Sequence, residues 1–276
     1  MDLDFDFPRY VERRKGLRAQ EAREGAAYGY SGDLKVLRAM DGLRPVRQAI
    51  DTAARLWRQS ARAELLGPGV RASERQLPRV HAAAKLAAER LHVELPVIYV
   101  SPAPVGEQLM GAYTFGTSDE AAILLHASLV DGLDDDELIF AIGRECGHLQ
   151  NGHVAPRTAL YFLRHGSSRF VRWVVRPAVA TLQAWHRRGE VTGDRAGLLA
   201  CRDLGAARRG LLKVALGAGA VEGADQTALL EAHPGLRARL AALDAFAESA
   251  FYQGVLGQPG GITLEACDEK IGEILQ

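Results

Sequence analysis

One segment in the middle of the chain, residues 134–149, constrains the fold most, because its first turn and its apolar spacing are both those of a helix. Asp134 can cap the free backbone N–H groups at the start, and Glu137 stands three residues later, as in a capping box. The neighbouring acids also oppose the positive end of a helix. Leu138 and Ile142 follow at the spacing of one helix face. We therefore predict a helix that packs against a core.

Ionisable residues interrupt the apolar pattern of this predicted helix. At about 100° per residue, Arg144, His148 and Glu145 lie at about 0°, 40° and 100° around the axis, on one side of the helix. Further along the chain, Glu190 and Asp194 are one helical turn apart and share a face. Two helices that present acids and a histidine at turn spacing are typical of zinc peptidases with a His-Glu-x-x-His motif and a Glu ligand from a second helix.

The rest of the chain reads as helices around a small sheet. Apolar spacing predicts helices over 46–57 and from Pro78 to Leu91. After Pro96 the period changes, and 97–100, 112–115 and 122–125 are short β-prone runs. We therefore predict a mostly helical α+β fold with a sheet of about three strands.

Composition excludes several classes of protein. The chain has 276 residues, of which 47% are hydrophobic, so it is neither disordered nor fibrous. Lys+Arg and Asp+Glu both number 34, which argues against a nucleic-acid partner. Three separated cysteines favour reduced thiols. The N-terminus is acidic, unlike a secretory signal, and no apolar run of about 18 residues occurs. We expect a soluble cytoplasmic protein without a transmembrane segment.

From about Leu34 to Leu256 the chain resembles the HtpX and CAAX-prenyl-protease family of zinc metallopeptidases, which are gluzincins, and especially its soluble bacterial members. The blocks that carry the resemblance are Tyr113-Thr-Phe-Gly116, Asp135-Asp-Glu-Leu138, Gly143 to His153, Trp185 to Leu199 and His233 to Arg239. The resemblance implies a zincin-like fold. We divide the chain into an N-terminal arm and helix (1–74), a metallopeptidase-like domain (75–256) and a short C-terminal tail (257–276).

The resemblance also implies roles for six residues. These are the general base Glu145, the second zinc ligand His148, the third ligand Glu190, a carboxylate behind the ligands at Asp194, and a histidine and an arginine near the metal and the developing oxyanion at His233 and Arg239. Where the family has its first ligand histidine, this chain has Arg144. An arginine has no lone pair to offer a metal.

Arg144 changes the charge of the predicted site. A guanidinium about 4 Å from Zn²⁺ repels it by roughly 8 kcal/mol at an effective dielectric near 20. With zinc, the three predicted carboxylates leave the site at −1, and with Arg144 and no metal they leave it at −2. We predict that the guanidinium bridges Glu190 and Asp194 and that zinc is bound weakly or not at all; alternatively, Arg144 extends into solvent. The sequence further suggests that Arg144→His alone would rebuild a zinc site.

Three other histidines could be either metal ligands or ordinary structural residues. His186 lies one turn before Glu190 and could replace the lost ligand, as could His233, which the resemblance places nearby. A solvated basic turn is the simpler interpretation of His186 and its neighbours. His153 is rotated by about 140° from His148, so we expect a helix-end histidine bonded to the backbone.

Three hypotheses about function follow. In the first, the protein is an inactive or impaired pseudo-peptidase whose former substrate groove binds a peptide or protein partner, for example along an edge strand. In the second, it is an active zinc endopeptidase with unusual ligation through His148, Glu190 and either His186 or His233. In the third, it is a membrane-surface or scaffold protein that uses the Arg-rich segment 157–188 on an anionic membrane. That segment could equally be a solvated face balanced by the acidic residues 131–137.

Overall fold

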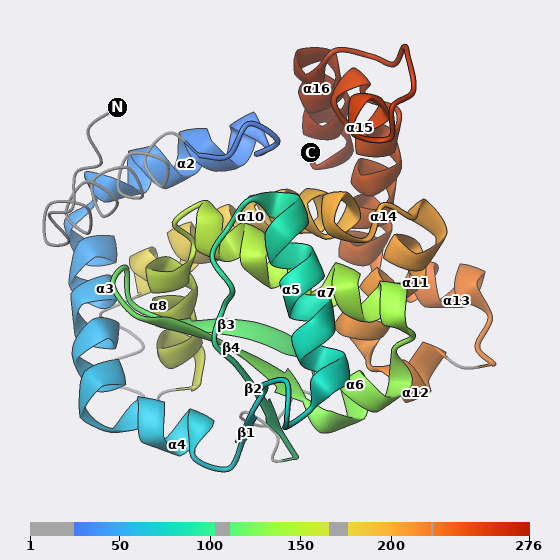
Figure 1. The fold of residues 1–276 in the computed structure, drawn as a ribbon. Helices are drawn as coiled ribbons and strands as arrows, with labels where there is room; N and C mark the ends of the chain where they lie inside the picture. The colour runs from blue at the N-terminus through green and yellow to red at the C-terminus, as the bar shows by residue number, and fades with distance from the viewer. Residues whose placement is uncertain (1–24, 103–110, 166–175, 222) are drawn as a thin grey trace, which may run out of the picture.

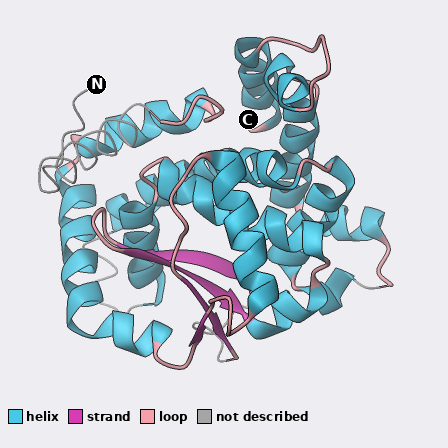
Figure 2. Ribbon diagram, viewed as in Figure 1, coloured by secondary structure: helices cyan, strands magenta, loops and turns pink. Residues whose placement is uncertain are grey.

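The computed structural model describes residues 25–102, 111–165, 176–221 and 223–276 (Figure 1). These residues are mostly helical, with one small sheet, so the predicted α+β class is confirmed (Figure 2). Within these ranges, no helix combines the length and the apolar character that crossing a membrane requires.

The sheet has four strands rather than three. They are β1 (Val70–Arg71), β2 (Ile98–Ser101), β3 (Ala112–Gly116) and β4 (Ala121–His126), in the spatial order β1-β2-β4-β3. Strand β2 runs parallel to β4, while β1 and β3 are antiparallel to their neighbours. The three expected strands are present, but β1 was missed because two exposed residues carry no alternation of polar and apolar side chains.

Helices surround the sheet. In chain order they are α2 (Ser31–Asp41), α3 (Arg44–Leu56), the π-helical turn η1 (Trp57–Ala61), α4 (Arg62–Leu66), α5 (Pro78–Leu91), α6 (Ala127–Gly132), α7 (Asp135–Gln150), α8 (Val154–His165), α10 (Arg176–Cys201), α11 (Leu204–Leu216), α12 (Ala218–Val221), α13 (Gln226–Ala232), α14 (Pro234–Ala247), α15 (Ala250–Val255) and α16 (Leu264–Ile274). The predicted helices over 46–57 and 78–91 are confirmed.

Both faces of the sheet are buried, but against different partners. Ile123 and Leu125 of β4 point into the main core with α5 and α7, which lie side by side in Figure 1. Leu124 of the same strand points the other way, into a smaller core with Phe115 and Trp57. The alternation of side chains along a strand explains this division. The sheet is therefore held between the central helices and the N-terminal helices.

Helix α7 begins as the sequence predicts and packs against both α5 and α10. Asp134 accepts the backbone N–H of Glu137 at 2.9 Å, and the Glu137 carboxylate accepts the N–H of Asp134 at 3.0 Å, which completes the capping box. Glycines of α10 let the two helices approach closely. A Cβ at Gly193 would lie 2.8 Å from Nε2 of His148, and one at Gly197 would lie 2.7 Å from Cγ of Arg144. The polar side chains of α7 therefore fit directly beneath α10.

The segment 257–276, expected as a short tail, contains helix α16. This helix contacts α14 and α2, and its residues Cys267 and Ile271 are buried in the main core. Asp268 accepts the backbone N–H of Ser31 at 2.9 Å and a guanidinium N–H of Arg195 on α10 at 2.5 Å. The C-terminal helix therefore joins the first described helix to α10. The domain boundaries at 74 and 256 stay predictions.

Candidate functional site

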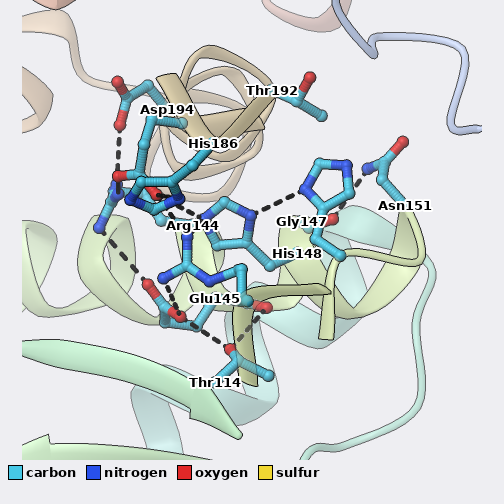
Figure 3. A network of polar contacts seen from close by, with 12 residues as sticks. Thr114, Arg144, Glu145, Gly147, His148, Asn151, His186, Thr192 and Asp194 are labelled. Atoms are coloured by element: carbon cyan, nitrogen blue, oxygen red, sulfur yellow. Dashed lines mark hydrogen bonds and ion pairs between the residues drawn. The ribbon is translucent and has the colours of Figure 1, made fainter. Parts of the chain in front are cut away.

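The predicted site residues of α7 and α10 meet in one buried cluster of ionisable side chains (Figure 3). The cluster draws on five elements: Arg144, Glu145 and His148 come from α7, His186, Glu190 and Asp194 from α10, Arg157 from α8, Arg239 from α14 and Thr114 from β3. The polar faces of α7 and α10 therefore share one site, as the sequence suggests.

Arg144 makes the bridge expected from the sequence. Its Nε donates to Asp194 Oδ1 at 2.7 Å, and its Nη2 donates to Glu190 Oε2 at 2.6 Å. Its Nη1 lies 3.5 Å from Glu145 Oε1. The side chain is only 2% exposed, so the alternative in which Arg144 extends into solvent is wrong. The two carboxylates raise the pKa of Arg144 against the opposing effect of burial, and the guanidinium stays charged.

Arg239 reinforces the same two carboxylates from α14. Its Nε and Nη2 donate to the two oxygens of Asp194 at 2.8 and 2.7 Å, and its Nη2 lies 3.1 Å from Glu190 Oε2. His233, which the resemblance pairs with Arg239, is not brought to the cluster. It is exposed at the start of α14, and its Nδ1–H donates to the carbonyl oxygen of Leu229 at 2.9 Å. The expected place of His233 beside the site is therefore not seen.

Arg157 is the member of the cluster that the sequence analysis missed. We placed it in a basic surface segment, but its side chain is buried, because α8 directs it between the two site helices. Its Nη1 donates to His148 Nε2 at 2.8 Å and to Glu190 Oε1, and its Nη2 lies 3.6 Å from Glu145 Oε2. The only signal in the sequence was the net charge of the predicted site, which is −2 when Arg144 is its only cation and so calls for further positive charge. Arg157 and Arg239 bring it to zero, with three guanidiniums against three carboxylates.

The remainder of the segment 157–188 differs from Arg157. Arg164 and Arg187 are exposed, as a solvated basic face requires. Residues 166–175, which include two arginines, a phenylalanine and a tryptophan, lie outside the described residues. Contact of this segment with an anionic membrane stays a prediction, without Arg157.

His153 is not bonded as expected. Its Nδ1 lies 3.0 Å from His148 Nδ1, and its Nε2 lies 3.0 Å from Asp33 Oδ2. The prediction of a side chain bonded to the backbone is wrong, because α2 brings a buried carboxylate to the end of α7. A guanidinium can only donate, so Arg157 fixes Nε2 of neutral His148 as an acceptor. His148 therefore carries its hydrogen on Nδ1 and donates to His153, which donates to Asp33.

His186 lies on the side of α10 that faces the cluster. Its Nδ1 is 3.6 Å from Glu190 Oε1, and this buried nitrogen has no hydrogen-bond partner within the described part of the chain. Burial lowers the pKa of His186 to about 4, so its ring is neutral at pH 7. The side chain of His186 is 32% exposed although its Nδ1 is buried, so the interpretation as a solvated turn holds for only part of this residue. The same interpretation fits the exposed Arg187.

Burial and the arginines set the protonation of the other members. Burial alone would raise the pKa of Glu190, but Arg157 and Arg239 hold it well below its usual range. Burial raises the pKa of Glu145, against Arg157, Arg144 and a hydrogen bond of 2.7 Å from the Thr114 hydroxyl. Burial and the nearby Arg157 lower the pKa of His148 well below its usual value. The cluster thus sets guanidiniums and carboxylates around imidazole rings, and those of His148 and His186 are neutral at pH 7.

These residues, as they stand, do not fit a zinc ion. Nε2 of His148 and Oε1 of Glu190 receive Arg157, Oε2 of Glu190 receives Arg144 and Arg239, and Arg144 itself has no lone pair to give. Among the described residues, no three His, Cys, Asp or Glu side chains are arranged to hold a metal. The predicted ligand atoms of His148 and Glu190 are already used as hydrogen-bond acceptors.

Comparisons with known proteins agree with the motifs. The sequence profile of Peptidase family M48 matches residues 74–247, more than half of the chain. Plastoglobule-localized metallopeptidase 48, chloroplastic, from Arabidopsis thaliana is 33% identical over 172 residues, which cover 61% of this chain and 48% of the relative. The chain thus spans about half the length of that curated relative. No solved structure matches.

Proposed function

Because the chain belongs to peptidase family M48, a metallopeptidase family, we propose that it is a member in which arginines have replaced the zinc ion, leaving peptidase activity lost or impaired. The observation that carries the proposal is the bridge from Arg144 to Glu190 and Asp194, at 2.6 and 2.7 Å. Arg144 stands where the family has a ligand histidine. The charge that zinc would supply is supplied there by the protein itself.

The charge balance supports this proposal. Three carboxylates and three guanidiniums sum to zero, so the buried cluster is neutral without a metal. A dication added to this arrangement would leave a charge of +2 in a buried site, where uncompensated charge is costly. Each guanidinium that stayed about 4 Å from zinc would repel it by roughly 8 kcal/mol. Zinc would therefore have to displace the arginines before it could bind.

The position of Glu145 supports the same conclusion. Burial raises its pKa, which is how a carboxylate becomes suited to act as a general base near neutral pH. Its Oε2 instead accepts from Thr114 and faces Arg157, while its Oε1 faces Arg144. Glu145 is therefore a member of the ion network, in which a guanidinium faces each of its two carboxylate oxygens.

The test is metal content together with proteolysis. We expect the purified natural protein to carry less than ~0.1 zinc per chain and to cleave casein no faster than its Glu145→Gln variant, with or without a chelator. The Glu145→Gln variant is the matched control, because it removes the general base without changing side-chain size. Stoichiometric zinc, with cleavage that both the chelator and Glu145→Gln abolish, would contradict the proposal.

One observation favours the second candidate, an active zinc endopeptidase with unusual ligation. His186 presents an unpartnered buried nitrogen 3.6 Å from Glu190, whereas His233 is exposed and bonded to its own segment. If the natural protein does bind zinc, the ligands would be His148, Glu190 and His186. In that case His186→Ala would release the metal and His233→Ala would not.

We extend the proposal to a peptide or protein partner at the edge strand β3. The N–H of Gly116 points away from β4 and donates to the Thr158 hydroxyl at 3.0 Å. Because N–H directions alternate along a strand, the N–H groups of Ala112 and Thr114 also point away from β4. An extended chain would pair with that end of the strand. Fluorescently labelled β-casein is the probe. We expect Ala112→Pro to weaken its binding at least ~10-fold, and Val70→Pro on the opposite edge to leave it unchanged; no binding to the natural protein would refute this part.

A further inference from the structure

We propose that Arg157 is a second substitute for the metal, and that its Nη1 atom holds the point between His148 and Glu190 at which those side chains would bind an ion. This inference rests on the proposed function and deepens it. It assigns to the chain a closed metal site, in which the residue that keeps zinc out lies on α8, outside the motif. The change at Arg144 removes a ligand, whereas Arg157 occupies the centre.

The spacing of the acceptor atoms carries the inference. Nε2 of His148 and Oε1 of Glu190 are 3.5 Å apart, and Nδ1 of His186 is 3.6 Å from the same Glu190 oxygen. Two ligand atoms about 2.1 Å from a tetrahedral zinc ion lie roughly 3.4 Å from each other. Nε2 of His148 and Oε1 of Glu190 are therefore already spaced as a pair of zinc ligands, and these two atoms share the Nη1 atom of Arg157.

The contacts of Arg157 are those of a cation at that shared point. Nη1 donates to His148 Nε2 at 2.8 Å and also to Glu190 Oε1. His148 is oriented for this contact from behind, because its Nδ1 bonds His153, which in turn bonds the buried carboxylate of Asp33. Metal-binding histidines are commonly held in this way through their second nitrogen. The hydrogen bonds that would orient a metal-binding histidine are thus present, but they orient His148 toward the guanidinium of Arg157.

The backbone around Arg157 holds the guanidinium in place. Helix α8 starts directly after the turn that ends α7, and the N–H of Arg157 donates to the carbonyl oxygen of His153 at 3.0 Å. The next residue, Thr158, is buried and accepts the N–H of Gly116 on β3. The side chain of Arg157 is 8% exposed. Because α8 is bonded to β3 through Thr158 and also contacts α10, the packing of this helix holds Arg157 in the site.

This geometry changes an expectation from the sequence. Arg144→His, which by sequence alone rebuilds a ligand set, leaves Arg157 on His148 and Glu190. Zinc binding therefore requires removal of Arg157 as well. We expect Arg144→His alone to bind zinc no more than ~10-fold tighter than the natural protein. The double variant Arg144→His/Arg157→Met should bind about one zinc per chain, at least ~100-fold tighter than Arg144→His.

The experiment is isothermal titration of the full chain with zinc sulfate, together with melting temperatures in zinc and in chelator. The matched control is Arg144→His/Arg164→Met, which removes an exposed arginine of the same helix and should behave like Arg144→His. Arg157→Gln replaces Arg157→Met in a second double variant. If a double variant is unfolded in chelator, recovery of its circular dichroism with one equivalent of zinc counts as binding.

Each outcome decides the inference. Submicromolar zinc binding by Arg144→His alone overturns it, whatever the double variants do, because Arg157 then yields its place freely. Folded double variants that bind zinc no tighter than Arg144→His also overturn it. Stoichiometric zinc in the natural protein overturns the proposed function instead, and weak binding by the natural protein and Arg144→His with tight binding by a double variant supports both.

Discussion

The two ends of helix α7 carry ion clusters of similar chemistry in different surroundings. At the N-terminal end, Arg209 pairs with Asp134 at 3.2 Å, and the two side chains are 53% and 51% exposed. In the C-terminal half, Arg144 pairs with Glu190 and Asp194, and no member of that set is more than 11% exposed. Each end has arginines on carboxylates. We call Arg209, Lys213, Asp134 and Glu137 the outer cluster, and Arg144, Glu190, Asp194 and the arginines that contact them the inner cluster, whose central side chains are almost wholly buried.

Burial changes how much an ion pair contributes to stability. Exposed pairs contribute about 0–1 kcal/mol, because water solvates both charges when they separate. In a buried cluster, removal of one partner leaves a charge that nothing solvates, at a cost of about 3–5 kcal/mol. Glu137 stands between these cases: it is buried, but its partners Arg209 and Lys213 reach it from the surface at 2.9 and 2.7 Å. Loss of one charge should therefore lower stability little in the outer cluster and strongly in the inner cluster.

The largest expected effect comes from opening the inner cluster. Arg144→Ala should lower the free energy of unfolding by ~3–5 kcal/mol, because it leaves three buried carboxylates with only Arg157 and Arg239. Urea denaturation followed by circular dichroism measures it. A loss below ~0.5 kcal/mol would mean that the inner cluster behaves like the surface.

Acid should act mainly on the inner cluster. The pKa of Glu190 is held well below its usual value of 4.5, so the contribution of Glu190 to stability is present above pH 4.5 and is lost as the pH falls below that value. The stability then falls with a slope of up to ~1.4 kcal/mol per pH unit for each proton taken up. Arg157→Met weakens the cause of the shift and should make this acid slope shallower, measured by urea unfolding between pH 6 and pH 2. If Arg157→Met leaves the slope unchanged, or if Arg164→Met changes it equally, protonation of Glu190 is not the cause of the loss of stability in acid.

The cap at the outer end has an intermediate effect. Asp134→Ala removes the acceptor of the Glu137 N–H and should destabilise the protein by ~1 kcal/mol. Asp134→Asn keeps an acceptor for the cap but loses the charge opposite Arg209. If the asparagine variant is as unstable as the alanine variant, the ion pair matters more than the cap, and the distinction between the two ends of α7 weakens.

The smallest effect belongs to the exposed arginine. Arg209→Ala should cost less than ~1 kcal/mol, and 1 M NaCl should remove most of that difference by screening. The same salt should leave the cost of Arg144→Ala nearly unchanged, because ions do not enter the buried cluster. Unfolding curves at low and high salt for both variants compare the two ends directly.

Local pattern was enough for much of the fold. The capping box at Asp134, the apolar faces of α3, α5 and α7, and three strands were all predicted, because each depends on neighbours a few residues away. The strand β1 escaped because two exposed residues carry no period. Membership of a metallopeptidase family was also visible, since its motifs are short.

Helical periodicity and charge were enough to predict the bridge from Arg144 to Glu190 and Asp194, because periodicity puts these residues on two polar faces and their charges attract. The other residues of the cluster are set by tertiary packing and could not be predicted in this way. Arg157 comes from a separate helix, and its direction depends on how α8 packs against α10 and β3. Asp33 reaches His153 from α2, more than a hundred residues away along the chain. Burial of charge makes neutrality compulsory, but periodicity does not say which distant residue provides it, since that depends on the packing of whole helices.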